Sequence, residues 1–143
     1  HQRLANGENS IGKARVVRGG KEVTIVTWGA MVHVALEAAE AAVKRGIEAE
    51  IIDLRTILPF DAQTCIESVR RTGRLIVLQE AQYTGGLGHT VSSRILEEAF
   101  WNLENAPVVI GALDTPVPFS PPLEDHTIPT SELVVRHIRR MCE

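Results

Sequence analysis

The residues best placed for chemistry are a glutamate and a set of glycines that follow a predicted strand. Glu80 comes directly after the predicted strand 74–79, and a carboxylate at the end of a strand can act as a general base. Gly85, Gly86 and Gly88 precede a predicted helix, whose first backbone amides can bind a phosphate. Their spacing is neither GxGxxG nor that of a P-loop. These four residues are therefore loop candidates, and the simpler interpretation is a tight turn that Glu80 anchors.

A second charged pair flanks Leu54 on another predicted strand. Asp53 and Arg55 could together bind a charged group, but side chains two residues apart on a strand share a face and more often contact each other or a neighbouring loop. The histidines lack the spacing of a metal site, and Ser92-Ser93 lacks the GxSxG motif of a nucleophile. We therefore assign no catalytic, cofactor-binding or metal-binding residue to this chain. The histidines concerned are His33, His89, His126 and His137.

Alternating strands and helices must position these residues. Two β-rich runs, 15–18 and 22–27, are separated by Gly19-Gly20-Lys21, which predicts a hairpin with the first strand antiparallel at a sheet edge. The second run is nearly all β-branched, as expected of a central strand covered on both faces. Further parallel strands are predicted at 48–54, 74–79 and 107–111.

Four helices are predicted between and after these strands. The first runs from about Met31 to Arg45 and ends at Gly46, the second starts at Asp61 and ends at Gly73, the third spans about 89–102, and the last opens at Thr130 and ends at Met141. Their apolar stripes predict which side chains are buried. The pattern predicts an α/β fold with three αβα layers and a mostly parallel five-stranded sheet with one antiparallel edge strand. The stripes comprise Val32, Ala35, Leu36, Ala39 and Val43; Ile66 and Val69; Val91, Ile95 and Leu96; and Leu133, Val134 and Ile138.

Composition limits the classes of function. A chain of 143 residues suits one domain, which we place at 11–143, with 1–10 as a linker or tag remnant. A net charge of −3 without basic runs argues against nucleic acid and anionic membranes as partners, and no apolar run could span a bilayer. Cys65 and Cys142 are expected to be free thiols in a soluble, intracellular protein. The prolines of 114–122 predict a stiff surface connection.

Taken together, the motifs resemble a known family over about residues 11–141. The chain is similar to the C-terminal domain of the beta subunit of the thiamine-dependent decarboxylating component of 2-oxo acid dehydrogenase complexes, of branched-chain or pyruvate type. Many relatives have His at the position of Gln79, and many read differently over 86–90. The motifs that carry the resemblance are Gly12-Lys13-Ala14, 23–29 with Val32-His33, 52–59, Thr72-Gly73-Arg74, Glu80-Ala81, Thr84-Gly85-Gly86, 97–100, Ala106-Pro107-Val108, 114–119 and Ile128-Pro129.

The resemblance implies a transketolase C-terminal fold and a role in assembly rather than in catalysis. It implies that thiamine diphosphate binds in a separate N-terminal domain, outside this chain. The implied partners are an alpha subunit, a second beta subunit and the peripheral subunit-binding domain of the dihydrolipoyl acyltransferase. For docking to that basic partner we consider the acidic residues Asp114 and Glu143. The implied location is the bacterial cytoplasm or the mitochondrial matrix.

Two alternatives remain open on the sequence. One is a free-standing flavodoxin-like module that binds a small anion or a nucleotide at Gly85–Gly88. The other is the C-terminal domain of a transketolase or a deoxyxylulose phosphate synthase, which share the fold. The Asp114–Phe119 segment and Gly12-Lys13-Ala14 argue against the second alternative by pattern alone.

Overall fold

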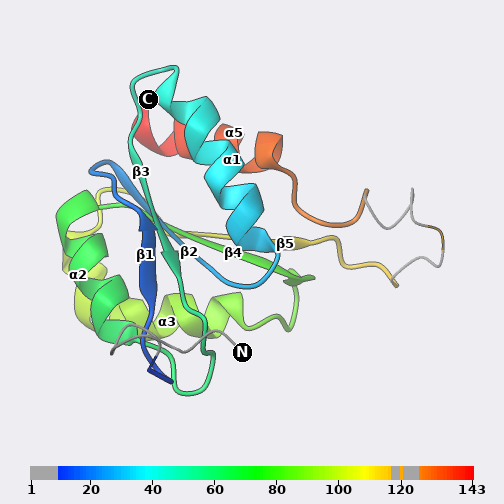
Figure 1. Cartoon of the computed structure of the whole chain (residues 1–143), viewed down its shortest axis with the longest axis horizontal. Coiled ribbons are helices and arrows are strands. Elements are labelled where there is room, and N and C mark those ends of the chain that lie inside the picture. The colour runs from blue at the N-terminus through cyan, green and yellow to red at the C-terminus, as the bar shows by residue number, and fades with distance from the viewer. Residues whose placement is uncertain (1–9, 117–119, 121–125) are drawn as a thin grey trace, which may run out of the picture.

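A five-stranded sheet lies between two pairs of helices in the computed structural model, which describes residues 10–116, 120 and 126–143 (Figure 1). The strand order is β1-β3-β2-β4-β5, and every neighbouring pair is parallel except β1 with β3. The predicted three-layer fold with one antiparallel edge strand is therefore confirmed, as is the central position of β2. The strands are β1 (Arg15–Arg18), β2 (Val23–Thr27), β3 (Ala49–Asp53), β4 (Leu75–Gln82) and β5 (Val108–Ala112).

The predicted hairpin between β1 and β2 is wrong, because β1 pairs with β3 instead. Val16 lies opposite Ile52, and β3 separates β1 from β2. Gly20 lets the segment between β1 and β2 pass close to the start of β3, since a Cβ on Gly20 would collide with the backbone of Ala49. The glycines therefore do not form a turn between two paired strands. The amides of Lys21 and the next residue both donate to the carbonyl of residue 48, which holds this crossing against the start of β3.

The helices divide into two pairs, one on each face of the sheet (Figure 1). α1 (Met31–Val43) and α5 (Ser131–Cys142) cover one face, and α2 (Ala62–Thr72) and α3 (Gly88–Ala99) cover the other. A short 3-10 helix, η1 (Phe100–Asn102), continues α3. Alternation along the strands supplies both cores, since Ile25 packs with α1 and Val26 packs with α2.

The predicted helix ends are largely confirmed. Asp61 caps α2, because its carboxylate accepts a hydrogen bond from the amide of Thr64, and Gly73 ends α2 with φ = 68°. Gly46 (φ = 79°) closes α1, where the next amide donates back to the carbonyl of Ala42. Thr130 caps α5 in the same way as Asp61 caps α2.

The apolar stripe predicted for α1 is only partly right. The buried side chains of this helix are mainly alanines, and Val43 is 44% exposed while Val32 and Leu36 are half-buried. Small side chains let α1 approach α5 and the sheet closely, which moves the larger residues to the edge of the contact. The inward-facing residues predicted on α2, α3 and α5 are buried or half-buried, as expected.

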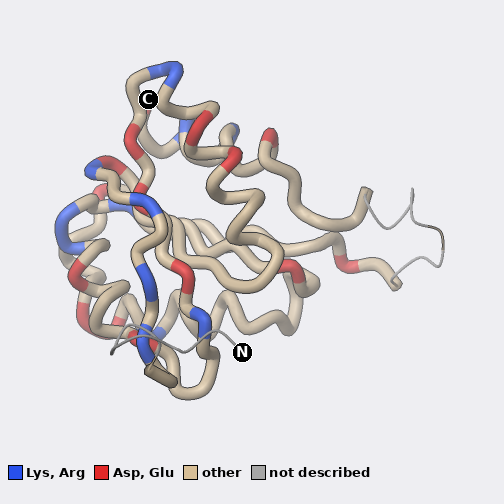
Figure 2. Tube along the Cα trace, viewed as in Figure 1, with Lys and Arg blue, Asp and Glu red and all other residues tan. Residues whose placement is uncertain are grey.

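Three further predictions concern the proline-rich segment, membrane-spanning helices and the distribution of surface charge. Pro116 is exposed, whereas Pro118, Pro121 and Pro122 lie outside the described residues. Within the described ranges, no helix is both long enough and apolar enough to cross a membrane. Acidic and basic residues alternate over the described surface elements rather than forming one basic face (Figure 2).

Candidate functional site

The strand order reverses between β2 and β4, which is where an open parallel sheet usually binds a ligand. The side chains at this point are directed to internal partners. The hydroxyl of Thr27 donates to the carbonyl of Leu78 at 2.9 Å, and Thr27 is fully buried. The next residue on β4, Gln79, is fully buried as well.

Gln79 organises the glycine loop that follows β4. Its Oε1 accepts a hydrogen bond from the amide of Gly88 at 2.5 Å, and its Nε2 donates to the carbonyl of Gln82 at 2.9 Å. Because a Cβ on Gly86 would overlap this amide group, and one on Gly88 would lie 2.9 Å from Oε1, the glycines are required for the loop to close around Gln79. The loop packs around a side chain of its own chain.

The expectation that Glu80 anchors this loop is wrong, because Gln79 performs that role. Glu80 is exposed, one residue beyond the buried part of β4. The sequence contained a signal for Gln79, since an amide side chain ends an otherwise apolar strand. Whether Gln79 or Glu80 faces inward depends on where β4 leaves the core, and the sequence pattern does not show that point.

Beyond Gln79, two loops at the carboxyl ends of β4 and β5 are tied together. The carboxylate of Asp114 accepts hydrogen bonds from both the amide (2.8 Å) and the hydroxyl (2.7 Å) of Thr84. These two bonds hold the pKa of Asp114 below its ordinary value. Tyr83 and His89 stack edge to face with ring centroids 4.7 Å apart. Asp114, a docking candidate, is therefore also an internal bridge.

The Asp53–Arg55 pair is structural, as expected, but the two side chains have different partners. Asp53 accepts a hydrogen bond from the backbone amide of Arg55 at 3.0 Å, and Arg55 adopts a left-handed conformation with φ = 54°. Its guanidinium donates to the carbonyl of Lys13 at 2.9 Å. Arg55 thereby connects the β3–α2 loop to the segment that precedes β1.

That preceding segment, residues 10–14, is held along its length, and we call it the N-terminal clasp. The amide of Gly12 donates to the hydroxyl of Thr56 at 3.1 Å, and the amide of Ala14 donates to the carboxylate of Asp61 at 3.2 Å. The ammonium group of Lys13 lies 3.8 Å from the same carboxylate. Two motifs that carry the family resemblance, Gly12-Lys13-Ala14 and the run 52–59, are thus in direct contact.

Asp61 is the buried charge of this arrangement. Burial raises the pKa of its carboxyl, but hydrogen bonds from Thr64 and Ala14, together with the charge of Lys13, outweigh burial and leave the pKa lowered. The same carboxylate therefore caps α2 and binds the N-terminal clasp in its ionised form.

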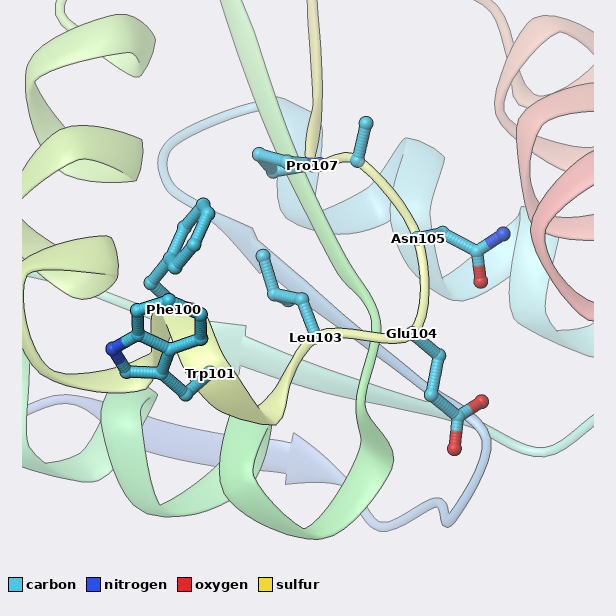
Figure 3. Close-up of a pocket in the computed structure, with 7 residues that line it drawn as sticks. Phe100, Trp101, Leu103, Glu104, Asn105 and Pro107 are labelled. Atoms are coloured by element: carbon cyan, nitrogen blue, oxygen red, sulfur yellow. The ribbon is translucent and has the colours of Figure 1, made fainter.

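Two apolar grooves lie at opposite ends of α3. The first, the Leu58 groove, has a volume of about 310 Å³ and lies between the β3–α2 loop and the start of α3. The second, the Trp101 groove, has a volume of about 420 Å³ at η1 and the start of β5. In Figure 3, Leu103 and Phe100 point toward the space beside Pro107, while Glu104 points away. The Leu58 groove is lined by Ile57, Leu58, Pro59, Phe60, Leu87 and Arg94.

Both grooves expose large apolar side chains. Trp101 is 92% exposed and Leu58 is 84% exposed. Phe100 stacks edge to face on Trp101 with centroids 5.1 Å apart, so the two rings form one exposed aromatic pair. Exposed aromatic and aliphatic side chains beside a groove are typical of surfaces that meet other proteins.

The second docking candidate, Glu143, lies at the end of α5. Its carboxylate accepts two hydrogen bonds from the guanidinium of Arg139, at 3.0 and 3.1 Å, and these hold the pKa of Glu143 below its ordinary value. Asp114 follows β5 at the other end of the sheet (Figure 1). The structure therefore does not bring Asp114 and Glu143 together.

A diphosphate could approach this domain most readily at the start of α3. The first amide of α3, which could face a diphosphate, is already bonded to Gln79. In the described ranges, no group of three or more His, Cys, Asp or Glu residues could hold a metal ion. The bond between the amide of Gly88 and Gln79 also disfavours an anion site at Gly85–Gly88, which is the basis of the flavodoxin-like alternative.

The known proteins that this chain resembles in sequence include beta subunits of several enzymes. The chain is 46% identical to acetoin:2,6-dichlorophenolindophenol oxidoreductase subunit beta of Cupriavidus necator, over 90% of this chain and 38% of that protein. It is 39% identical to pyruvate dehydrogenase E1 component subunit beta of Rickettsia bellii, over 92% of this chain and 40% of that protein. It is 45% identical to the mitochondrial 2-oxoisovalerate dehydrogenase subunit beta of Dictyostelium discoideum, over 80% of this chain and 31% of that protein.

The solved structures give the same result for the fold. A split-gene transketolase, in an inactive beta4 tetramer, superposes with a TM-score of 0.78 at 32% identity, over 93% of this chain and 42% of that one. The chain thus spans about two fifths of the length of the first two relatives and of this transketolase. The family described as "Transketolase, C-terminal domain" matches residues 12–134, and the chain belongs to that family.

Proposed function

We propose that this chain is the assembly and docking domain of a dehydrogenase beta subunit, and that it contributes subunit contacts rather than catalytic groups. The observation that carries the proposal is the similarity to three beta subunits over 80 to 92% of the chain, when these residues make up only 31 to 40% of each relative. The internal use of Gln79, Asp114 and Asp61 supports it, because these polar side chains on β4, after β5 and at the start of α2 hold segments of the chain together.

The proposed partners are an alpha subunit and a second beta subunit. The two exposed apolar grooves support this, because such surfaces are normally covered in an assembly. The assembly of the similar split-gene transketolase into a tetramer of beta chains is consistent with interfaces built by this kind of subunit.

The whole enzyme is proposed to act on a small carbonyl substrate with thiamine diphosphate that binds outside this domain. The names of the relatives offer three substrates, namely pyruvate, 2-oxoisovalerate and acetoin. The sequence pattern alone suggested only the 2-oxo acids. The proposed location is the cytoplasm of a bacterium or the mitochondrial matrix, because the relatives include bacterial and mitochondrial beta subunits.

Docking to the acyltransferase core is proposed to use the end of α5. Asp114 and Glu143 lie at opposite ends of the sheet, so a small subunit-binding domain would reach one of them. Glu143 is the better candidate, since the carboxylate of Asp114 is held by Thr84 within the sheet end, whereas Glu143 is exposed at the end of α5. A basic partner would compete with Arg139 for this carboxylate.

Calorimetric titration with the peripheral subunit-binding domain tests this proposal. Saturable binding to the wild-type chain is expected, and E143Q should weaken it about fivefold or more, as expected for loss of one charge-assisted contact. D114N and E67Q serve as controls, because Asp114 lies at the other end of the sheet and Glu67 is exposed on α2. Absence of binding by the wild-type chain would count against docking, and equal affinities for all variants would remove Glu143 from the site.

A further inference from the structure

We propose that the Leu58 groove is the seat of the domain that precedes this one in the full-length beta subunit. This proposal rests on the function proposed above, since it requires that the chain be the C-terminal part of a longer subunit. The occupant is the apolar surface of that preceding domain, and the groove is one face of an interface within a single subunit.

The first observation is where the chain meets the groove. Gly12 of the N-terminal clasp donates a hydrogen bond to Thr56, and a Cβ on Gly12 would lie 3.2 Å from Cγ of Pro59, which lines the groove. Ile11 precedes Gly12 and Leu58 precedes Pro59, and each of these two apolar residues is 84% exposed. The N-terminal clasp therefore lies at the rim of the Leu58 groove.

The second observation is that the clasp is fixed in direction. Arg55 binds the carbonyl of Lys13, and Asp61 binds both the amide of Ala14 and the ammonium group of Lys13. These contacts span residues 12–14, and all of their partners lie between residues 55 and 61, on the loop that forms the groove. A domain joined through such a clasp stays close to the groove at a high effective concentration, so even a modest apolar contact is populated.

The third observation is that the other groove is remote from this point. α3 has 12 residues, which corresponds to about 18 Å of helix, and the Trp101 groove lies beyond its far end. The Trp101 groove is therefore left for a different subunit, and it provides a matched control surface with similar exposure of a large apolar side chain.

Limited proteolysis of the full-length beta subunit tests the proposal. Leu58→Glu should increase the rate at which trypsin separates the two domains about tenfold, because it opens the interface without unfolding either domain. Leu58→Ser should have a smaller effect in the same direction. Trp101→Glu should leave the rate at its wild-type value, and circular dichroism should show that all variants are folded.

The outcomes separate this inference from the proposed function. Equal rates for wild-type, Leu58→Glu and Leu58→Ser subunits that still bind the alpha subunit would overturn the inference and leave the function standing. A reading frame without a preceding domain would overturn both. Sedimentation of the 143-residue chain as a dimer that Leu58→Glu dissociates would show that a second copy fills the groove, which also overturns the inference.

Discussion

Oε1 of Gln79 lies 2.5 Å from the amide nitrogen of Gly88, so the side chain at the end of the buried part of β4 satisfies the first amide of α3. At the other end of the same side-chain amide, Nε2 of Gln79 donates a hydrogen bond to the carbonyl of Gln82, where β4 gives way to the glycine loop. One buried glutamine thus occupies the place where an open parallel sheet would otherwise present a free helix start to a ligand.

Gln79→Ala is expected to destabilise the chain by about 3 kcal/mol, because it leaves a buried amide and a carbonyl without partners and opens a cavity. Urea unfolding monitored by circular dichroism measures this. Gln82→Ala is the control, since Gln82 is exposed and its side chain donates only to the carbonyl of Thr115; it should cost less than about 1 kcal/mol. Similar losses for both variants would contradict the role given to Gln79.

Gly86→Ala is expected to cost about 2 kcal/mol or more, because its Cβ would overlap the side chain of Gln79. Gly19→Ala is the matched control, as nothing lies within 4 Å of a Cβ there, and its stability should stay within about 0.5 kcal/mol of wild type. Thermal melts of the two variants compare them directly. If Gly86→Ala melts with the wild type, the loop does not close around Gln79 as described.

The pH dependence of stability should carry the signature of Asp61. Its pKa is lowered on folding from an ordinary value of 3.8, so the stability it confers is complete above about pH 4 and is lost as pH falls through the lowered value. Asp61→Asn should weaken both the α2 cap and the N-terminal clasp at pH 7, at a cost of about 2 kcal/mol, and the cost should shrink toward pH 3. A cost that is the same at pH 3 and pH 7 would show that the carboxylate charge is not involved.

The two thiols should differ in reactivity. Burial, together with the nearby charge of Asp61, raises the pKa of Cys65 to about 12, so this thiol is neither accessible nor ionised in the folded chain. Cys142 is half-buried, and burial raises its pKa as well. With a disulfide reagent at pH 8, only Cys142 should react before unfolding and Cys65 only after it. Early labelling of Cys65, located by peptide mapping, would contradict the packing of α2.

Local signals in the sequence predicted much of this fold. Asp61, Gly73 and Gly46 end or begin helices because each acts on backbone groups a few residues away, which a linear pattern contains. The pairing of β1 with β3 was missed, because it depends on a close crossing at Gly20 against residues almost thirty positions later. For the same reason the partner of Arg55 was not readable, since Lys13 lies 42 residues away.

The candidate site was predicted in place but not in detail. Gly86 and Gly88 do form a turn between a strand and a helix, as expected, and the turn interpretation agrees with the structure better than a ligand loop does. The anchor was assigned to Glu80 rather than to Gln79, because the point at which β4 emerges from the core is set by the neighbouring strand β5. The exposed pair of Phe100 and Trp101 was overlooked, since they were included in a continuous helix.

The central claim is that these residues supply assembly surfaces and that the cofactor binds elsewhere. Calorimetric titration of the purified chain with thiamine diphosphate and magnesium, followed by a decarboxylation assay on the same sample, tests it most directly. No saturable heat and no turnover above a protein-free blank are expected. Saturable binding accompanied by turnover would contradict it.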